Sequence, residues 1–216
     1  MQEPAIALFA RAPVIGQVKT RLIGSLSPAA ACGLHRALAQ DAWDVLTAIP
    51  GNKVFLYSDQ EHPEWRELAA GRLRLQRGAD LGERMLKCFD ELRDGGHGPL
   101  LIVGSDTAAL TPEIVAPWSE KLRAAGAVLG PAEDGGYWAI GCRSPNRKMF
   151  DGVEWSSNRT GSQTAEALTS CGMAMSFLES RYDVDTLADL ARLKADQRVG
   201  AHVRAWLETQ KEVSGC

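Results

Sequence analysis

The 216-residue sequence has no excess of positive charge, no closely spaced cysteine pair and no long apolar segment. Lys and Arg total 24 against 27 Asp and Glu, and a net charge of −3 excludes the electrostatic footprint of a general nucleic-acid-binding protein. No stretch approaches the roughly 20 apolar residues of a membrane span. Glu3 stands where a signal peptide carries basic residues. We therefore expect a cytoplasmic protein that binds neither nucleic acid nor membrane.

The cysteines are few and scattered, and none belongs to a CxxC pair. They are Cys32, Cys88, Cys142, Cys171 and Cys216. An odd number without metal-ligand spacing argues against a disulfide framework and against a cysteine-rich zinc site. We expect reduced, mostly buried thiols.

Length and composition favour one domain over residues 1–216. Domains commonly span about 100 to 200 residues, and α/β domains are often longer. Hydrophobic residues make up 45% and charged residues 24% of the chain, which is ordinary for a soluble protein. No internal repeat or linker divides the sequence.

Short apolar runs alternate with longer stretches of helical period, a pattern typical of an α/β fold with a mainly parallel sheet. Strands are expected at residues 6–9, 54–57, 73–75, 100–103, 127–130, 137–140 and 175–178. Helices are expected at about residues 28–48, 64–70, 81–92, 163–170, 187–196 and 200–210, with a further one opening at Thr111. Residues 100–103 are a continuous aliphatic run, which indicates a central strand buried on both faces.

The loop after the first strand brings together three cations and a glycine: Arg11, Gly16, Lys19 and Arg21. Ligands of open α/β sheets bind outside the carboxyl ends of the strands, so this loop is a candidate site. The glycine permits a close backbone approach, and the cations suit the phosphates of a nucleotide. Neither the Walker A spacing nor G-x-G-x-x-G occurs. A solvated basic loop is the alternative.

Three aspartates are candidate metal ligands. Asp106 follows the central strand, where a carboxylate suits a divalent cation bound to phosphates. In an extended segment, Asp183 and Asp185 would project to one face, since residues two apart share a side of a strand. Helix capping is the alternative for each, although Thr186 with Asp189 already makes a capping-box pair for the next helix.

The turn between the expected strands at 127–130 and 137–140 holds Gly135 and Gly136, against which a ligand could lie. A plain wide hairpin turn is the alternative. The four histidines show no metal spacing and are interpreted as surface or helix residues. Trp155 lies in a loop that could close over a substrate.

Four segments together resemble the DUF2064 group of glycosyltransferase-A-like proteins, which is similar to the phospholactate guanylyltransferases. In order along nearly the whole chain, the segments are residues 9–22, 104–106, 129–137 and 183–190. The resemblance implies a nucleotide-diphospho-sugar transferase fold, with a mixed, mainly parallel sheet flanked by helices.

The resemblance also implies roles for individual residues. Gly16, Lys19 and Arg21 match the phosphate-contacting loop, and Asp106 matches the metal-binding aspartate. Asp183 and Asp185 match the later acidic cluster, while Gly135 and Gly136 match the acceptor-side wall. After Asp106 the family continues with a small residue and Pro-Asp-Leu, but this chain has Ala108 and Ala109 in place of Pro-Asp. Loss of that carboxylate puts metal or acceptor binding in doubt.

We therefore expect a transferase that uses Mg²⁺ or Mn²⁺ and binds a nucleotide or nucleotide-sugar together with a small-molecule acceptor. Lys19, Arg21 and Asp106 are expected to carry catalysis by neutralising charge on the phosphates, and Arg11 to help bind the nucleotide. The three cations of the first loop slightly favour nucleotidyl transfer from a triphosphate. Glycosyl transfer and a non-catalytic nucleotide-binding module are the alternatives. The sequence does not predict the base, the acceptor or the oligomeric state.

Overall fold

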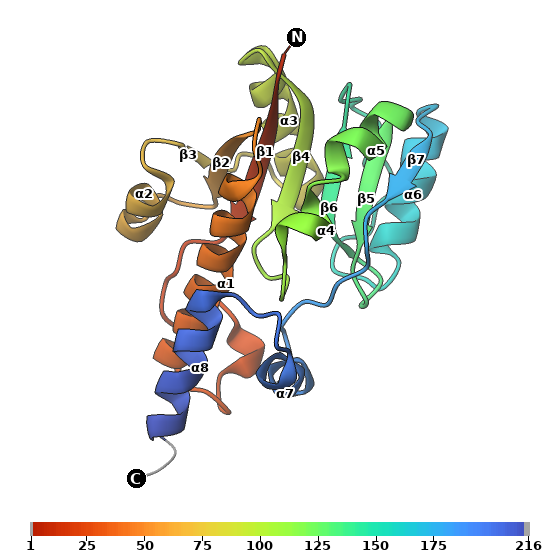
Figure 1. Ribbon diagram of the computed structural model, residues 1–216. Helices are drawn as coiled ribbons and strands as arrows, with labels where there is room; N and C mark the ends of the chain where they lie inside the picture. Colours follow the sequence, from red (N-terminus) through yellow and green to blue (C-terminus); the bar gives the residue numbers. More distant parts are fainter. Residues whose placement is uncertain (1, 214–216) are drawn as a thin grey trace.

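Seven strands form one mixed sheet between two layers of helices in the computed structural model, which describes residues 2–213 (Figure 1). The strand order is β3-β2-β1-β4-β6-β5-β7. The strands are β1 (Glu3–Ala10), β2 (Lys53–Ser58), β3 (Leu73–Leu75), β4 (His97–Gly104), β5 (Ala127–Pro131), β6 (Tyr137–Cys142) and β7 (Met175–Phe177). Each lies where the sequence predicts a strand.

The sheet is mainly parallel, as expected. β1 pairs in parallel with both β2 and β4, and β3 and β7 pair in parallel with β2 and β5. β6 is antiparallel to β4 and β5. The carboxyl ends of β1, β2, β3 and β4 therefore meet at one edge of the sheet, where the loops that follow them come together.

The helices cover both faces of the sheet. They are α1 (Pro28–Ala48), α2 (Pro63–Ala69), α3 (Leu81–Asp94), α4 (Pro112–Val115), α5 (Trp118–Ala124), α6 (Thr160–Ser170), α7 (Leu187–Ala195) and α8 (Ala201–Val213). Ile6 and Leu8 of β1 pack with α1, α2, α4 and α5, while Ala5 and Ala7 pack on the other face with α3 and α6. The alternation of side chains along β1 thus supplies both halves of the core.

The single helix expected from Thr111 is two short helices in the structure. α4 ends at Val115, and α5 begins at Trp118 after Pro117. Proline lacks a backbone N–H and clashes with the preceding turn, so Pro117 interrupts the helix.

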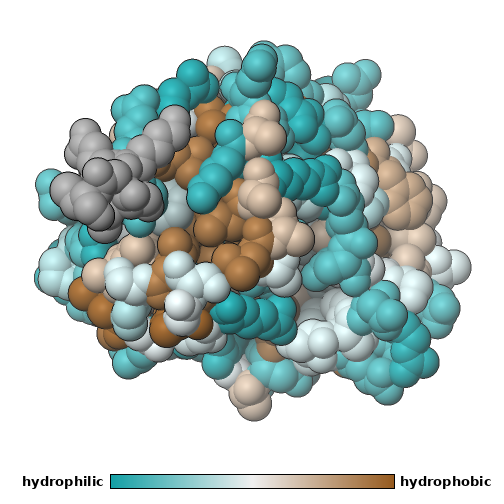
Figure 2. Space-filling view, turned by 90° about the horizontal axis from the view of Figure 1, so that it is seen from below, coloured by the Kyte–Doolittle hydropathy of each residue, from teal (hydrophilic) through white to brown (hydrophobic). Residues whose placement is uncertain are grey.

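A third apolar cluster lies beyond the carboxyl edge of the sheet, where α7 and α8 pack with α1 (Figure 1). Asp41 of α1 fixes α8 by accepting hydrogen bonds from the backbone N–H groups of His202 and Val203, at 2.9 and 3.0 Å. Thr186 and Asp189 form the expected capping box at the start of α7. The surface at this end is largely hydrophilic, with apolar side chains gathered toward its middle (Figure 2).

The four cysteines within the described residues are free, and Cys32, Cys88 and Cys142 are buried as expected. Cys216 lies outside the described residues. Among residues 2–213, no helix has the length and apolar character needed to cross a membrane.

Candidate nucleotide-binding site

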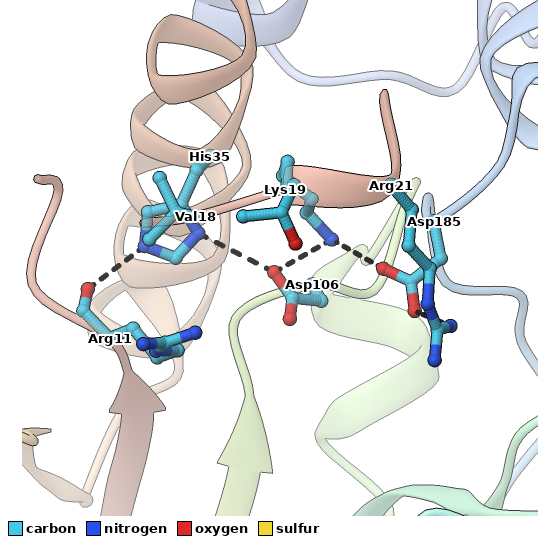
Figure 3. Close-up of a pocket in the computed structure, with 8 residues that line it drawn as sticks. Arg11, Val18, Lys19, Arg21, His35, Asp106 and Asp185 are labelled. Atoms are coloured by element: carbon cyan, nitrogen blue, oxygen red, sulfur yellow. Dashed lines mark hydrogen bonds and ion pairs between the residues drawn. The ribbon is translucent and has the colours of Figure 1, made fainter. Parts of the chain in front are cut away.

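The loop after β1 and the residue two places after β4 form a pocket of about 150 Å³ at the carboxyl edge of the sheet (Figure 3). It is lined by Arg11, Val18, Lys19, Thr20, Arg21, His35, Asp106 and Asp185. The structure thus brings together five of the residues singled out in the sequence: Arg11, Lys19, Arg21, Asp106 and Asp185.

Lys19 is the centre of this pocket. Its side chain is only 3% exposed, and its Nζ lies 2.9 Å from Asp106 Oδ1 and 3.1 Å from Asp185 Oδ1. Burial alone would lower the pKa of Lys19, but the two carboxylates outweigh it and raise the pKa above its ordinary value. The ammonium is therefore charged at neutral pH.

The backbone of Lys19 is left-handed, with φ 49° and ψ 39°. A residue with a Cβ adopts this conformation at a cost of about 1 kcal/mol or more. A short 3-10 turn, Thr20–Leu22, follows and places Arg21 beside Lys19. Lys19 thus combines an unfavourable backbone with two ion pairs of its side chain, and backbone strain of this kind is common at functional sites.

Asp106 has an ionised carboxylate. Its side chain is half exposed, but Oδ1 is buried and faces Lys19 and Nδ1 of His35, the latter at 3.5 Å. Burial by itself would raise the pKa of Asp106, but the charge of Lys19, with a contribution from His35, holds it well below its usual range. Asp106 is thus available as an anionic ligand at any physiological pH.

Asp185 faces two of the three cations of the first loop. Its Oδ1 is the partner of Lys19, and its Oδ2 accepts from a terminal nitrogen of Arg21 at 3.3 Å. Because the Arg21 side chain is 73% exposed, this outer pair contributes little to stability, and the guanidinium is free to exchange partners.

Asp183 lies beside the pocket without lining it. The backbone N–H of Val184 donates to the carbonyl of Asp106, and that of Ala108 donates to the carbonyl of Tyr182. These bonds hold the two segments antiparallel, and Thr107 Oγ1 donates to Asp183 Oδ1 at 2.8 Å. Burial, reinforced by the negative charge of Asp106, raises the pKa of Asp183 to about 6.

The beginning of the first loop is fixed by the strand next to β1. Asp59, just after β2, accepts the backbone N–H of Ala12 at 2.7 Å and pairs with Arg11 Nε at 3.4 Å. The Arg11 side chain is mostly exposed and reaches the pocket. Gly16 has φ 82°, so the loop turns where the sequence predicts a permissive residue, although Gly16 is not one of the residues that line the pocket.

The structure places Gly135 and Gly136 outside the residues lining this pocket. Gly135 has φ 91°, and a Cβ there would lie 2.1 Å from the carbonyl oxygen of Asn158. Its own carbonyl accepts the N–H of Gly161 at 2.9 Å. The geometry of Gly135 is thus explained by packing against the start of α6, and a role in an acceptor wall stays a prediction. Trp155 packs at 5.8 Å from the ring of Phe150.

The sequence did not single out His35 and Asp59. His35 lies in helix α1, one of the two places the sequence predicts for it, but its side chain is buried and not at the surface. Its Nε2 lies 2.9 Å from the carbonyl of Arg11, which can only accept, so Nε2 carries a hydrogen and donates it. One signal was present, because His35 continues the small apolar stripe of α1 formed by Ala31, Ala39 and Ala42. For Asp59 the signal was its position directly after a parallel strand.

The positions that lack Pro-Asp are buried. Ala108 and Ala109 are 0% and 7% exposed, and Ala109 has φ 52°. Ala108 belongs to the apolar cluster shared with α7 and α8. The bend after β4 therefore forms without the proline of the family pattern.

Among the described residues, no three His, Cys, Asp or Glu side chains are grouped so as to hold a metal ion. Two carboxylates, Asp106 and Asp185, instead hold the ammonium of Lys19 between them. Mg²⁺ commonly takes one or two protein carboxylates and completes its shell with water and phosphate oxygens. The pocket therefore fits a cation that arrives together with phosphate.

The family model described as "Uncharacterized protein conserved in bacteria (DUF2064)" matches residues 34–157, more than half of the chain. The chain belongs to DUF2064. The match includes Asp106 and the Gly135-Gly136 turn, whereas the first loop and Asp185 lie outside it.

This DUF2064 protein is similar to a solved structure described as a "putative nucleotide-diphospho-sugar transferase" from Desulfovibrio desulfuricans G20. The two are 27% identical with a TM-score of 0.87, and the alignment covers 98% of this chain and 96% of the other. The likeness confirms the expected fold and supports the expected transferase.

More distant structures share the fold. A cytidylyltransferase from Leptospira borgpetersenii serovar Hardjo-bovis is 15% identical with a TM-score of 0.58, covering 99% of this chain and 96% of the other. A CMP:2-keto-3-deoxy-manno-octonic acid synthetase complexed with CTP is 13% identical with a TM-score of 0.57, covering 89% and 97%. The comparison with curated proteins finds no significant match.

Proposed function

We propose that this DUF2064 protein is a divalent-metal-dependent nucleotidyltransferase that binds a nucleoside triphosphate and transfers its nucleotidyl group to a small-molecule acceptor. One observation carries the proposal. Two cations of the first loop, Lys19 and Arg21, line a single pocket with the carboxylate of Asp106 at the carboxyl edge of the sheet. Phosphate ligands and the divalent cation that accompanies them require these two kinds of group side by side.

In this proposal Arg11, Lys19 and Arg21 bind the phosphates, and Gly16 permits the loop to approach them. Asp106 and Asp185 hold Mg²⁺ or Mn²⁺, with Asp183 beside them as a third carboxylate. A metal held there would supply positive charge to offset the charge on the phosphates. Lys19 and Arg21 stabilise the pyrophosphate as it leaves, and the rigid edge of the sheet keeps the reacting groups aligned. No side chain of the pocket is required to form a covalent intermediate.

Asp59 and His35 act indirectly by holding the first loop and Asp106. Asp59 fixes the backbone at Ala12, and His35 donates to the backbone carbonyl of Arg11 while facing Asp106. A loop fixed at its beginning presents its cations with less loss of entropy on binding.

Binding and product analysis test the proposal. A thermal-shift screen of nucleoside triphosphates and nucleotide-sugars, each with and without Mg²⁺, identifies the donor, because a ligand that binds only the native state raises the melting temperature. The identified donor is then incubated with a panel of small acceptors. Release of pyrophosphate supports nucleotidyl transfer, and release of a nucleoside diphosphate supports glycosyl transfer. Metal-dependent binding without turnover for any acceptor would favour a nucleotide-binding module, and no nucleotide binding at all would refute the proposal.

Glycosyl transfer is the second candidate. It is favoured by the likeness, at 27% identity over nearly the full length, to the Desulfovibrio protein described as a nucleotide-diphospho-sugar transferase. We propose the protein to be cytoplasmic and to form a single domain.

A further inference from the structure

The ammonium of Lys19 lies between the two carboxylates to which we assign the metal. Its distances to Asp106 and Asp185 are 2.9 and 3.1 Å, and Figure 3 shows the side chain pointing between them. The Lys19 side chain is 3% exposed, whereas those of Asp106 and Asp185 are 49% and 42% exposed, so the ammonium is sheltered from water and the carboxylates remain open to a ligand. Within the ligand-free pocket, Lys19 therefore already supplies the positive charge that these carboxylates require.

A divalent cation bound between Asp106 and Asp185 would take the place that the ammonium of Lys19 now has. Two cations bound to the same pair of carboxylates repel each other, so each disfavours the binding of the other. If a metal ion alone displaced the ammonium of Lys19, the ammonium would lose both carboxylate partners without gaining an anion from the ligand. Metal alone is thus a poor ligand for the free protein.

Phosphate changes this balance because it offers Lys19 a new anionic partner. The lysine stem has four flexible carbons, and its ammonium is a compact charge with three rotatable donors that can bond to either carboxylate or phosphate oxygens. Arg21, whose side chain is 73% exposed, is able to make the same exchange from the outer oxygen of Asp185. After the exchange, Lys19 and Arg21 pair with phosphate, and the carboxylates of Asp106 and Asp185 pair with the metal ion.

We propose that Lys19 is a built-in counter-cation that keeps the metal site closed in the free protein and opens it only when phosphate arrives. The inference rests on the proposed function, since it takes the metal to bind Asp106 and Asp185. It predicts that metal and nucleotide bind cooperatively, with weak metal binding to the protein alone. The left-handed backbone of Lys19 agrees with a conformation maintained by these ion pairs.

Binary Mn²⁺ binding, measured by electron paramagnetic resonance of the free ion without any nucleotide, tests the inference. Lys19→Met keeps the length of the side chain and removes its charge, and should bind Mn²⁺ at least tenfold more tightly than wild type. Lys19→Gln should show the same gain, so the result does not depend on one variant folding well. The double variant Lys19→Met/Asp106→Asn should lose the gain, because it removes one of the two ligands.

Arg93→Met is the matched control. Arg93 pairs with Asp90 and Asp94 on the last turns of α3 and does not line the pocket, so Mn²⁺ affinity should equal that of wild type. Equal or weaker Mn²⁺ binding by both Lys19 variants would overturn the inference. In a parallel experiment, wild type is titrated with CTP and GTP in the presence of Mg²⁺ to measure nucleotide binding. If wild type binds nucleotide but the Lys19 variants show no gain in Mn²⁺ affinity, only the counter-cation role is refuted. If wild type binds no nucleotide, the proposed function itself is refuted.

Discussion

Asp183 should destabilise the metal-free protein at neutral pH, and Asp183→Asn should therefore stabilise it. Burial and the nearby charge of Asp106 raise the pKa of Asp183 to about 6 from an ordinary value of 3.8. Such a difference corresponds to about 3 kcal/mol at pH values above both. The asparagine oxygen is still able to accept the hydrogen bond from Thr107, so the substitution removes the charge and keeps the contact.

The expected pH dependence follows from the direction of this pKa. Below pH 3.8 the carboxyl group of Asp183 is protonated in both states and costs nothing. Between pH 3.8 and about 6 the unfolded chain releases a proton that the folded protein retains, so stability falls as the pH rises. Above pH 6 the full cost is present. The charged groups that affect Asp183 are Asp106 and Asp134, which raise its pKa, and Lys19, which lowers it.

Urea denaturation of wild type and Asp183→Asn, at pH 8 and at pH 4 with a chelator present, measures the effect. We expect the variant to be more stable by about 1 to 3 kcal/mol at pH 8 and nearly equal to wild type at pH 4. Asp185→Asn is the matched control, because it makes the same chemical change two residues away but removes the negative charge that pairs with Lys19 and Arg21, and should not stabilise. A gain of the same size at both pH values, or no gain at pH 8, would refute the reasoning.

Three further predictions concern the pocket and its surroundings. Arg21→Ala should weaken nucleotide affinity about tenfold or more in calorimetry, since a charge-assisted contact contributes about 1.5 to 3 kcal/mol, and an affinity equal to wild type would remove Arg21 from the phosphate site. Asp106→Asn should abolish the Mg²⁺ dependence of nucleotide binding while the protein stays folded by circular dichroism; retained metal dependence would leave Asp106 only a structural role in its loop. Gly135→Ala should lower the free energy of unfolding by about 2 kcal/mol or more, because its Cβ would lie 2.1 Å from Asn158 O at a φ of 91°. Thermal melts measure this loss, with Gly136→Ala as the control. A Cβ at Gly136 would lie 3.2 Å from the Asp134 side chain, so this variant should lose clearly less stability. Equal losses of stability in the two variants would contradict the packing role of Gly135.

Much of the fold follows from local patterns in the sequence. Ser27 followed by Pro28 specifies the start of α1, and its Oγ accepts the N–H of Ala30 at 3.1 Å. The aliphatic run at residues 100–103 predicts β4, which is central and buried on both faces. Such signals are contained within a few neighbouring residues. The division between α4 and α5 does not follow from the opening cap at Thr111 alone, because it depends on Pro117 six residues later.

The site was predictable only in part. The rule that ligands bind beyond the carboxyl ends of parallel strands correctly brought Lys19, Arg21 and Asp106 together. Individual pairings were not predictable, because residue types alone do not indicate which carboxylate meets which cation. The alternation rule places Asp183 and Asp185 on one face, yet in the structure one accepts from Thr107 and the other faces Lys19. That difference depends on the bridge to residues 106–108, which no local pattern encodes.

The separation of Lys19 from Asp185 along the chain affects how the protein gains its activity. The two residues are 166 positions apart, so we expect the pocket to form late, after both ends of the polypeptide have reached their positions. A chain still emerging from the ribosome, or cut before Asp185, would contain the first loop and Asp106 but not Asp185. Nucleotide affinity measured during refolding should consequently rise with the last kinetic phase and lag behind the recovery of helical circular dichroism. Ligand binding would then report completion of the tertiary structure.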